Sequence, residues 1–121
     1  MKELDSNSIA SKSKAFAVRI INLYQYLGSK RIYALAEQVL RSGTSIGANV
    51  REAVYGYSKS DFTFKMTTAL KEASETQYWL ELLHETGYLN DKQFESMTGD
   101  CNEIVKLLTS IIKTSKNSAQ N

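Results

Sequence analysis

Residues 36–57, AEQVLRSGTSIGANVREAVYGY, decide the fold class of this chain. Apolar and small side chains recur in this stretch at spacings that alternate between three and four residues. Such spacing keeps them on one face of an α-helix over three heptads, which is typical of helices that pack at shallow angles in a bundle. The face consists of Ala36, Val39, Gly43, Ile46, Val50, Ala53 and Tyr57.

Three further stretches carry an apolar stripe of the same kind, so the pattern predicts helices over about 7–27, 31–57, 59–86 and 91–114. The connections between them are short, and consecutive helices should therefore run antiparallel. We expect an all-α, up-down-up-down four-helix bundle that forms a single domain over residues 1–121, with a frayed tail over about 115–121. The additional stripes are Ile9, Phe16, Ile20, Leu23 and Leu27; Phe62, Met66, Ala69, Ala73, Thr76, Leu80 and Leu83; and Phe94, Met97, Cys101, Ile104, Leu108 and Ile111.

Residues that start and stop helices lie where these stripes begin and end. Polar residues 5–8 offer N-caps for the first helix, and Gly28 is placed to end it. Residues 58–61 have the spacing of a capping box at the start of the third helix, which should end at Gly87. Asn90 should cap the fourth helix.

Composition narrows the class of protein. The 121 residues include no proline, and no apolar run approaches the roughly 20 residues that a membrane span requires. The polar first ten residues do not form a signal or transit peptide. Cys101 is the only cysteine, which excludes an internal disulfide, and we expect a cytoplasmic protein.

The formal net charge of +2 is unevenly distributed along the chain. Residues 1–59 carry nine basic and four acidic side chains, a surplus of +5, whereas residues 60–121 carry six basic and nine acidic ones, a surplus of −3. Two interpretations remain open. Either the first two helices present a basic face to a polyanion, or the two halves of the bundle neutralise each other.

A polar stripe follows the second predicted helix, roughly 135° around it from the apolar face. Its members are Ser45, Asn49 and Glu52, extended by Gln38 and Arg41. The same segment contains Gly43 and Gly47, and a glycine within a helix costs about 1 kcal/mol relative to alanine. Either another backbone packs closely against these glycines, or the stripe is a polar solvent face with two incidental glycines.

Three blocks of the chain occur in a recognisable order: RSGTSIGANVREA at residues 41–53, SKSDF at 58–62 and ALKEASETQYWL at 69–80. Together they closely resemble the bacterial four-helix-bundle proteins named after the 23S rRNA intervening sequence, over roughly residues 15–112. The resemblance implies a closed ring, commonly a homopentamer, without enzymatic activity. It also implies kinship with the accessory protein of diversity-generating retroelements, a basic pentamer that binds nucleic acid and a reverse transcriptase.

No arrangement of residues indicates an active site. Glu81 and His84 have the Glu-x-x-His spacing of di-iron bundles, but such centres need the motif twice and His84 is the only histidine. Cys101 belongs to an apolar stripe, which favours a buried structural thiol over a nucleophile. We therefore expect no catalysis, no metal and no cofactor.

Two functions are compatible with this sequence. The first is an oligomeric scaffold that binds RNA or an RNA-associated protein through basic residues of its first two helices. The alternative is a purely structural or protein-binding ring with no nucleic-acid role. Neither involves a membrane or a small-molecule substrate. The candidate nucleic-acid contacts are Lys12, Arg19, Lys30, Arg31 and Arg51.

The turn near residues 57–58 sets the register between the second and third predicted helices. The numbers of opposed residues then sum to roughly 117 in an antiparallel pair. Arg41 should therefore pair with Glu72 or Glu75, and Glu52 with Lys65. The polar residues of the family motif are thus Arg41, Ser45, Asn49, Glu52, Glu72 and Glu75.

Overall fold

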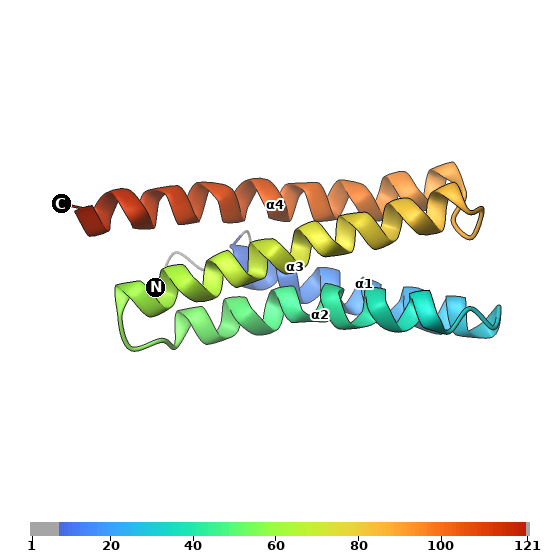
Figure 1. Ribbon diagram of the computed structural model, residues 1–121, viewed down its shortest axis with the longest axis horizontal. Coiled ribbons are helices and arrows are strands. Elements are labelled where there is room, and N and C mark those ends of the chain that lie inside the picture. The colour runs from blue at the N-terminus through green and yellow to red at the C-terminus, as the bar shows by residue number, and fades with distance from the viewer. Residues whose placement is uncertain (1–7, 121) are drawn as a thin grey trace.

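The computed structural model describes residues 8–120 of the chain. Within that range it contains four α-helices and no strand, which confirms the predicted all-α class. The helices are α1 (Ile9–Ser29), α2 (Ala34–Val54), α3 (Lys59–Glu85) and α4 (Asp91–Gln120). They lie alongside one another as long rods (Figure 1).

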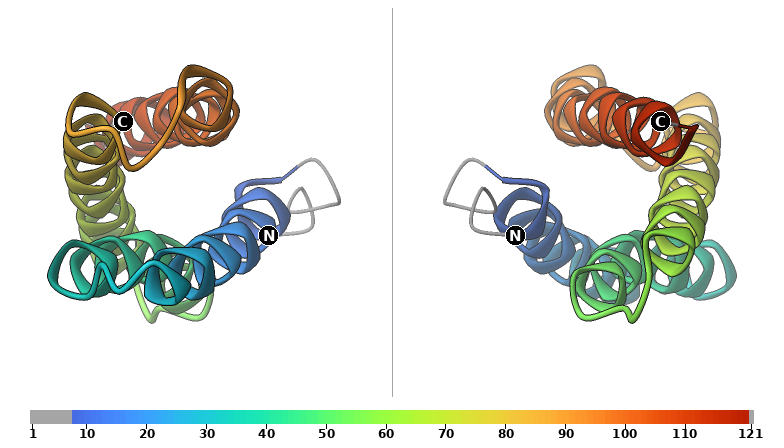
Figure 2. Two further views of the ribbon diagram at one scale, coloured as in Figure 1. Left: turned by 90° about the vertical axis from the view of Figure 1, so that its right-hand side faces the viewer. Right: turned by 90° about the vertical axis from the view of Figure 1, so that its left-hand side faces the viewer.

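Each helix reverses the direction of the one before it (Figure 1). Residue pairs that meet between α1 and α2 show this reversal, because Gly43 lies against Ile20 while the later Gly47 lies against the earlier Ser13. Viewed along the bundle, the helices follow one another around it in chain order, with α1 and α3 on one diagonal (Figure 2). In the described part of the chain, α1 packs against α2 and α4 but not against α3.

The predicted apolar stripes form the core almost throughout. Every predicted residue of the α1 stripe is buried, and in α3 all members except the half-buried Phe62 are buried. Two predictions are wrong. Tyr57 is fully exposed because α2 ends at Val54, which leaves Tyr57 in the turn. In α4 the buried residue of the last pair is Ile112 rather than Ile111.

Capping side chains begin three of the helices as expected. Ser8 accepts a hydrogen bond from the Ser11 amide at 3.3 Å, and Ser58 accepts one from the Asp61 amide at 3.0 Å. Residues 5–7 lie outside the described range. Asn90 and Gln93 form a reciprocal pair, in which each backbone amide donates to the other's side-chain oxygen at 2.8–2.9 Å. These bonds satisfy amides that lack partners within the first turn of a helix.

The ends of α1 and α3 differ in how well the sequence predicts them. Gly87 ends α3 as expected, with φ +87° and the Tyr88 amide donating to the Leu83 carbonyl at 2.9 Å. Gly28, by contrast, stays inside α1, and the left-handed residue of the first turn is Arg31 at φ 62°.

Two helix boundaries also differ from the prediction. The turn at Arg31 delays the start of α2 to Ala34 instead of about 31. The fourth helix continues to Gln120 instead of ending at about 114, and the fraying of the tail stays a prediction. The hydroxyls of Thr63 and Ser115 hydrogen-bond to each other, so the first turn of α3 supports this end of α4.

The two glycines of α2 mark a close approach to α1. A Cβ at Gly43 would lie only 2.7–2.9 Å from three side-chain atoms of the buried Ile20, and a Cβ at Gly47 would lie 3.4 Å from the Ser13 carbonyl oxygen. The structure therefore favours the close-packing interpretation of these glycines. Because Ile20 is completely buried and branched at Cβ, it has little room to move away.

Substitution of Gly43 tests this packing. We expect Gly43→Ala to lower the free energy of unfolding by about 1–3 kcal/mol, because overpacking against Ile20 outweighs the gain in helix propensity. Gly99→Ala is the matched control: Gly99 is a helical glycine with no atom within 4 Å of its Cβ position. That change should raise stability by roughly 0.5–1 kcal/mol. Urea unfolding at one protein concentration measures both, and equal effects of the two substitutions would contradict the packing argument.

Candidate functional site

Arg41 is held between two acidic side chains of α3. Its guanidinium pairs with Glu72 at 3.3 Å and with Glu75, which also accepts a hydrogen bond from the Trp79 indole N–H at 3.2 Å. The register expected from the α2–α3 turn is confirmed. About half of the Arg41 side chain is exposed, so the network lies at the edge of the α2–α3 contact.

The remaining polar residues of the motif make local contacts. Ser45 donates to the Arg41 carbonyl at 2.6 Å, and Asn49 donates to the Ser45 carbonyl at 2.9 Å, each within α2. Glu52 pairs with Lys65 at 2.7 Å, as predicted. The hydrogen bond to Glu52 and the charge of Glu52 raise the pKa of Lys65 above its ordinary value. The polar stripe therefore joins α2 to α3 and offers no convergent reactive groups.

Two of the five candidate basic residues are engaged by acids of α4. Lys12 pairs with Glu103 at 3.3 Å. Arg19 pairs with Asp100 at 2.6 Å and donates to the Ser96 carbonyl and hydroxyl at 3.2 and 2.8 Å. These contacts hold the α1–α4 side of the bundle together. They also neutralise basic residues of the first half of the chain with acidic residues of the second half, which is one of the two interpretations of the uneven charge distribution.

Lys30 and Arg31 lie together at the α1–α2 turn. Both are exposed, and the Lys30 ammonium lies 5.7 Å from the centre of the Tyr26 ring. Tyr33, three residues further along the chain, is also largely exposed. The turn therefore combines two cations with two accessible aromatic rings. Proteins use this combination of groups to bind single-stranded nucleic acids.

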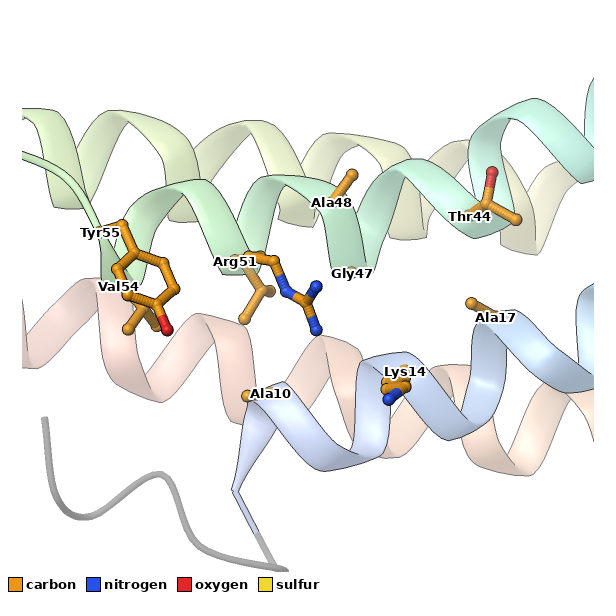
Figure 3. Close-up of a pocket in the computed structure, with 10 residues that line it drawn as sticks. Ala10, Lys14, Ala17, Thr44, Gly47, Ala48, Arg51, Val54 and Tyr55 are labelled. Carbon is orange, nitrogen blue, oxygen red and sulfur yellow. The ribbon is translucent and has the colours of Figure 1, made fainter.

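Arg51, the fifth candidate, lines a groove between α1 and α2 together with Lys14 (Figure 3). The groove has a volume of about 630 Å³. Small side chains, among them Ala10, Ala17 and Ala48, leave it open. The sequence analysis missed Lys14. Its position four residues after Ala10 and three before Ala17 puts it on the face of α1 beside α2, which helical spacing could have indicated.

The residues considered for chemistry have structural roles. His84 contacts Asp91 at 2.7 Å and stacks on Phe94 with 4.2 Å between ring centres. Within the described residues, no three His, Cys, Asp or Glu side chains lie close enough to hold a metal ion. Burial, followed by the charge of Asp100, raises the pKa of the Cys101 thiol to about 12. Cys101 is therefore a thiol rather than a reactive thiolate at neutral pH.

Comparison with known proteins identifies relatives of this fold and of the α2–α3 motif. The family model of the 23S rRNA-intervening sequence protein matches residues 5–110. This chain belongs to that family. It is also similar to the crystal structure of a protein of unknown function from the S23 ribosomal protein family of Bacteroides thetaiotaomicron VPI-5482. The two share 54% sequence identity and a TM-score of 0.85, over 87% of this chain and 98% of the other. Among curated proteins, none matches significantly.

The match to the intervening-sequence family spans all of α1 to α3 and most of α4, so the Arg41 network, the groove and the α1–α2 turn all lie inside it. No described helix is both long and apolar enough to cross a membrane.

A double-mutant cycle on Arg41 and Glu75 measures what the network contributes. We expect a coupling of about 0.5–1 kcal/mol between Arg41→Met and Glu75→Gln, because the guanidinium is half exposed and solvent screens the pair. Arg51→Met combined with Glu75→Gln is the control, since Arg51 has no ion-pair partner among the described residues and should show coupling near zero. Urea unfolding gives both values, and similar coupling in the two cycles would disprove a specific contact.

Proposed function

We propose that this member of the intervening-sequence family is a non-enzymatic scaffold that assembles into a homo-oligomer, with five subunits as its relatives imply, and binds RNA on the α1–α2 side. The observation that supports this proposal most directly is the kind of side chains exposed on the surface. The surface presents exposed apolar side chains and cations that have no ion-pair partner among the described residues, while His84 is held by Asp91 and Phe94 and the Cys101 thiol is buried. The resemblance also implies kinship with the accessory protein of diversity-generating retroelements, and that kinship would agree with a ring that holds nucleic acid or a nucleic-acid-associated protein.

Exposed apolar side chains support assembly. Val18 and Ile21 form an exposed pair on α1, and Phe64 and Tyr78 are exposed on α3. α1 and α3 lie on a diagonal of the bundle (Figure 2), so the exposed apolar side chains of α1 and those of α3 stand on two helices that do not contact each other. A closed ring needs such an arrangement, since each subunit uses one patch toward each neighbour.

Charge supports RNA as the partner of the α1–α2 side. Lys30, Arg31 and Arg51 have no ion-pair partner among the described residues, whereas Lys12 and Arg19 are neutralised by α4. Assembly would repeat these cations around a symmetry axis, so that modest sites act together through avidity. The acidic residues concentrated in α3 and α4 would repel RNA from the opposite side.

The second candidate is a ring scaffold with no nucleic-acid role. The ion pairs of Lys12 and Arg19 favour it, because they remove two of the five proposed contacts and leave less positive charge for a polyanion. It predicts the same assembly, and only a measurement of RNA binding separates it from the first proposal.

Assembly is tested by light scattering at micromolar concentration. We expect a mass several times the 13.6 kDa of one chain. Ile21→Asp should shift the protein to smaller species without loss of helix content, because it places a charge in an apolar contact. Ser110→Asp, an equally exposed site on α4, is the control and should leave the mass unchanged. A wild-type protein that stays at the mass of one chain would refute the proposal.

RNA binding is tested by titrating a labelled single-stranded RNA at about 50 and 200 mM salt. We expect sequence-independent binding that weakens steeply with salt, with a slope of about −0.7 for each phosphate contacted. Lys30→Glu combined with Arg31→Glu should weaken it while the oligomer stays intact. Lys113→Glu combined with Lys116→Glu makes the same charge change on exposed residues of α4 and should have a smaller effect. Absence of binding at the lower salt by a folded oligomer would leave the ring scaffold as the function.

A further inference from the structure

Lys14 and Arg51 place two positive charges on opposite walls of the α1–α2 groove. Figure 3 shows the Arg51 guanidinium reaching from α2 toward α1, where Lys14 lies. Among the described residues, no acidic side chain lines the groove. Neither cation has an ion-pair partner among the described residues, although Lys12, Arg19, Arg41 and Lys65 all do.

Two like charges that share a groove repel each other, and an anion between them removes that repulsion. Each cation can donate a charge-assisted hydrogen bond, and a phosphate group has enough acceptor oxygens to receive both. The small side chains between the two charged residues leave room for such an anion. At Gly47 the α1 backbone is only 3.4 Å from the position of a Cβ, so this side of the groove can hardly be filled from α2.

Tyr55 provides a second recognition element beside the cations. It lines the same groove, it follows the last residue of α2, and 80% of its surface is exposed. The packing of the chain does not explain why this large aromatic ring is left in water at the end of a groove that also holds two cations (Figure 3). Stacking of a nucleobase on such a ring is insensitive to sequence and covers its apolar face.

We propose that this groove binds one nucleotide unit of single-stranded RNA, with a backbone phosphate between Lys14 and Arg51 and its base against Tyr55. The inference rests on the proposed RNA-binding function and gives it a specific site. The volume of about 630 Å³ favours this ligand over a carboxylate side chain of a partner protein, which would leave most of the groove empty. A base can reach Tyr55 only when it is unstacked, so a duplex is excluded.

Binding of a fluorescein-labelled 20-nucleotide oligouridine to the wild-type oligomer tests the site. Lys14→Gln combined with Arg51→Gln should lower affinity at least about tenfold and make the salt slope about 0.7 shallower, which corresponds to the loss of the one phosphate contact. The control is Lys106→Gln combined with Lys113→Gln, which removes the same charge from exposed positions of α4 and should leave the slope almost unchanged.

The aromatic contact is tested separately. Tyr55→Ala should weaken binding about tenfold, and Tyr55→Phe should retain it, because stacking requires the ring and not the hydroxyl. Both substitutions change an exposed residue, so the oligomer should remain folded, which circular dichroism and light scattering check.

Distinct outcomes separate this inference from the function on which it rests. If the wild type binds oligouridine and the Lys30–Arg31 variant is impaired while the groove variants are not, the site is overturned and RNA binding stands. If the wild type binds no RNA at about 50 mM salt, both fail. Two further results would overturn the site. The first is that poly-glutamate of equal charge displaces labelled oligouridine as efficiently as unlabelled oligouridine does. The second is that a hairpin duplex binds the wild type as tightly as oligouridine does and binds the groove variants less tightly.

Discussion

The contact between α2 and α3 sets the geometry of the rest of the molecule. Its centre is buried, and the hydroxyls of Ser42 and Thr76 meet there at 2.8 Å inside an otherwise apolar seam. A shift by one helical turn would separate these two hydroxyls, although Thr76 would keep its hydrogen bond to the Glu72 carbonyl at 2.8 Å within α3, so the pair favours the observed register. The ion pairs of Arg41 and Glu52 at the margin agree with this register. α1 then packs on the other face of α2, where Gly43 and Gly47 permit close approach, and α4 packs on α3.

The sequence predicts the parts of this fold that depend on helical periodicity. Seams and register follow from the 3.6-residue repeat and from a short turn, so the sequence alone predicts the pairs of Arg41. Turns were less predictable, because glycine is only the usual residue for a left-handed position. Here Arg31 adopts that conformation although Gly28 lies three residues earlier. Tyr57 falls outside the buried stripe because α2 ends before it, at Val54.

The candidate site was less predictable than the fold. Which cations are neutralised depends on which side of α1 faces α4, and a count of charges in each half carries no such information. Lys12 and Arg19 lie on that side, and Lys14 lies beside α2. Residues two positions apart on one helix thus have different electrostatic roles, and only the packing of the neighbouring helices separates them.

Pairing between α1 and α4 also explains how a nearly neutral chain could engage a polyanion. The ion pairs remove charge that would otherwise be spread along α1. The cations of α1, α2 and their connecting turn that have no ion-pair partner among the described residues lie in the α1–α2 groove and at the α1–α2 turn. Both stand on one helix pair, about 24 Å apart for the sixteen residues from Lys14 to Lys30. A flexible single strand can bridge that distance, whereas a uniformly basic surface would bind any polyanion. Net charge is therefore a poor guide to this family member, because the arrangement of its unpaired cations decides what it can hold.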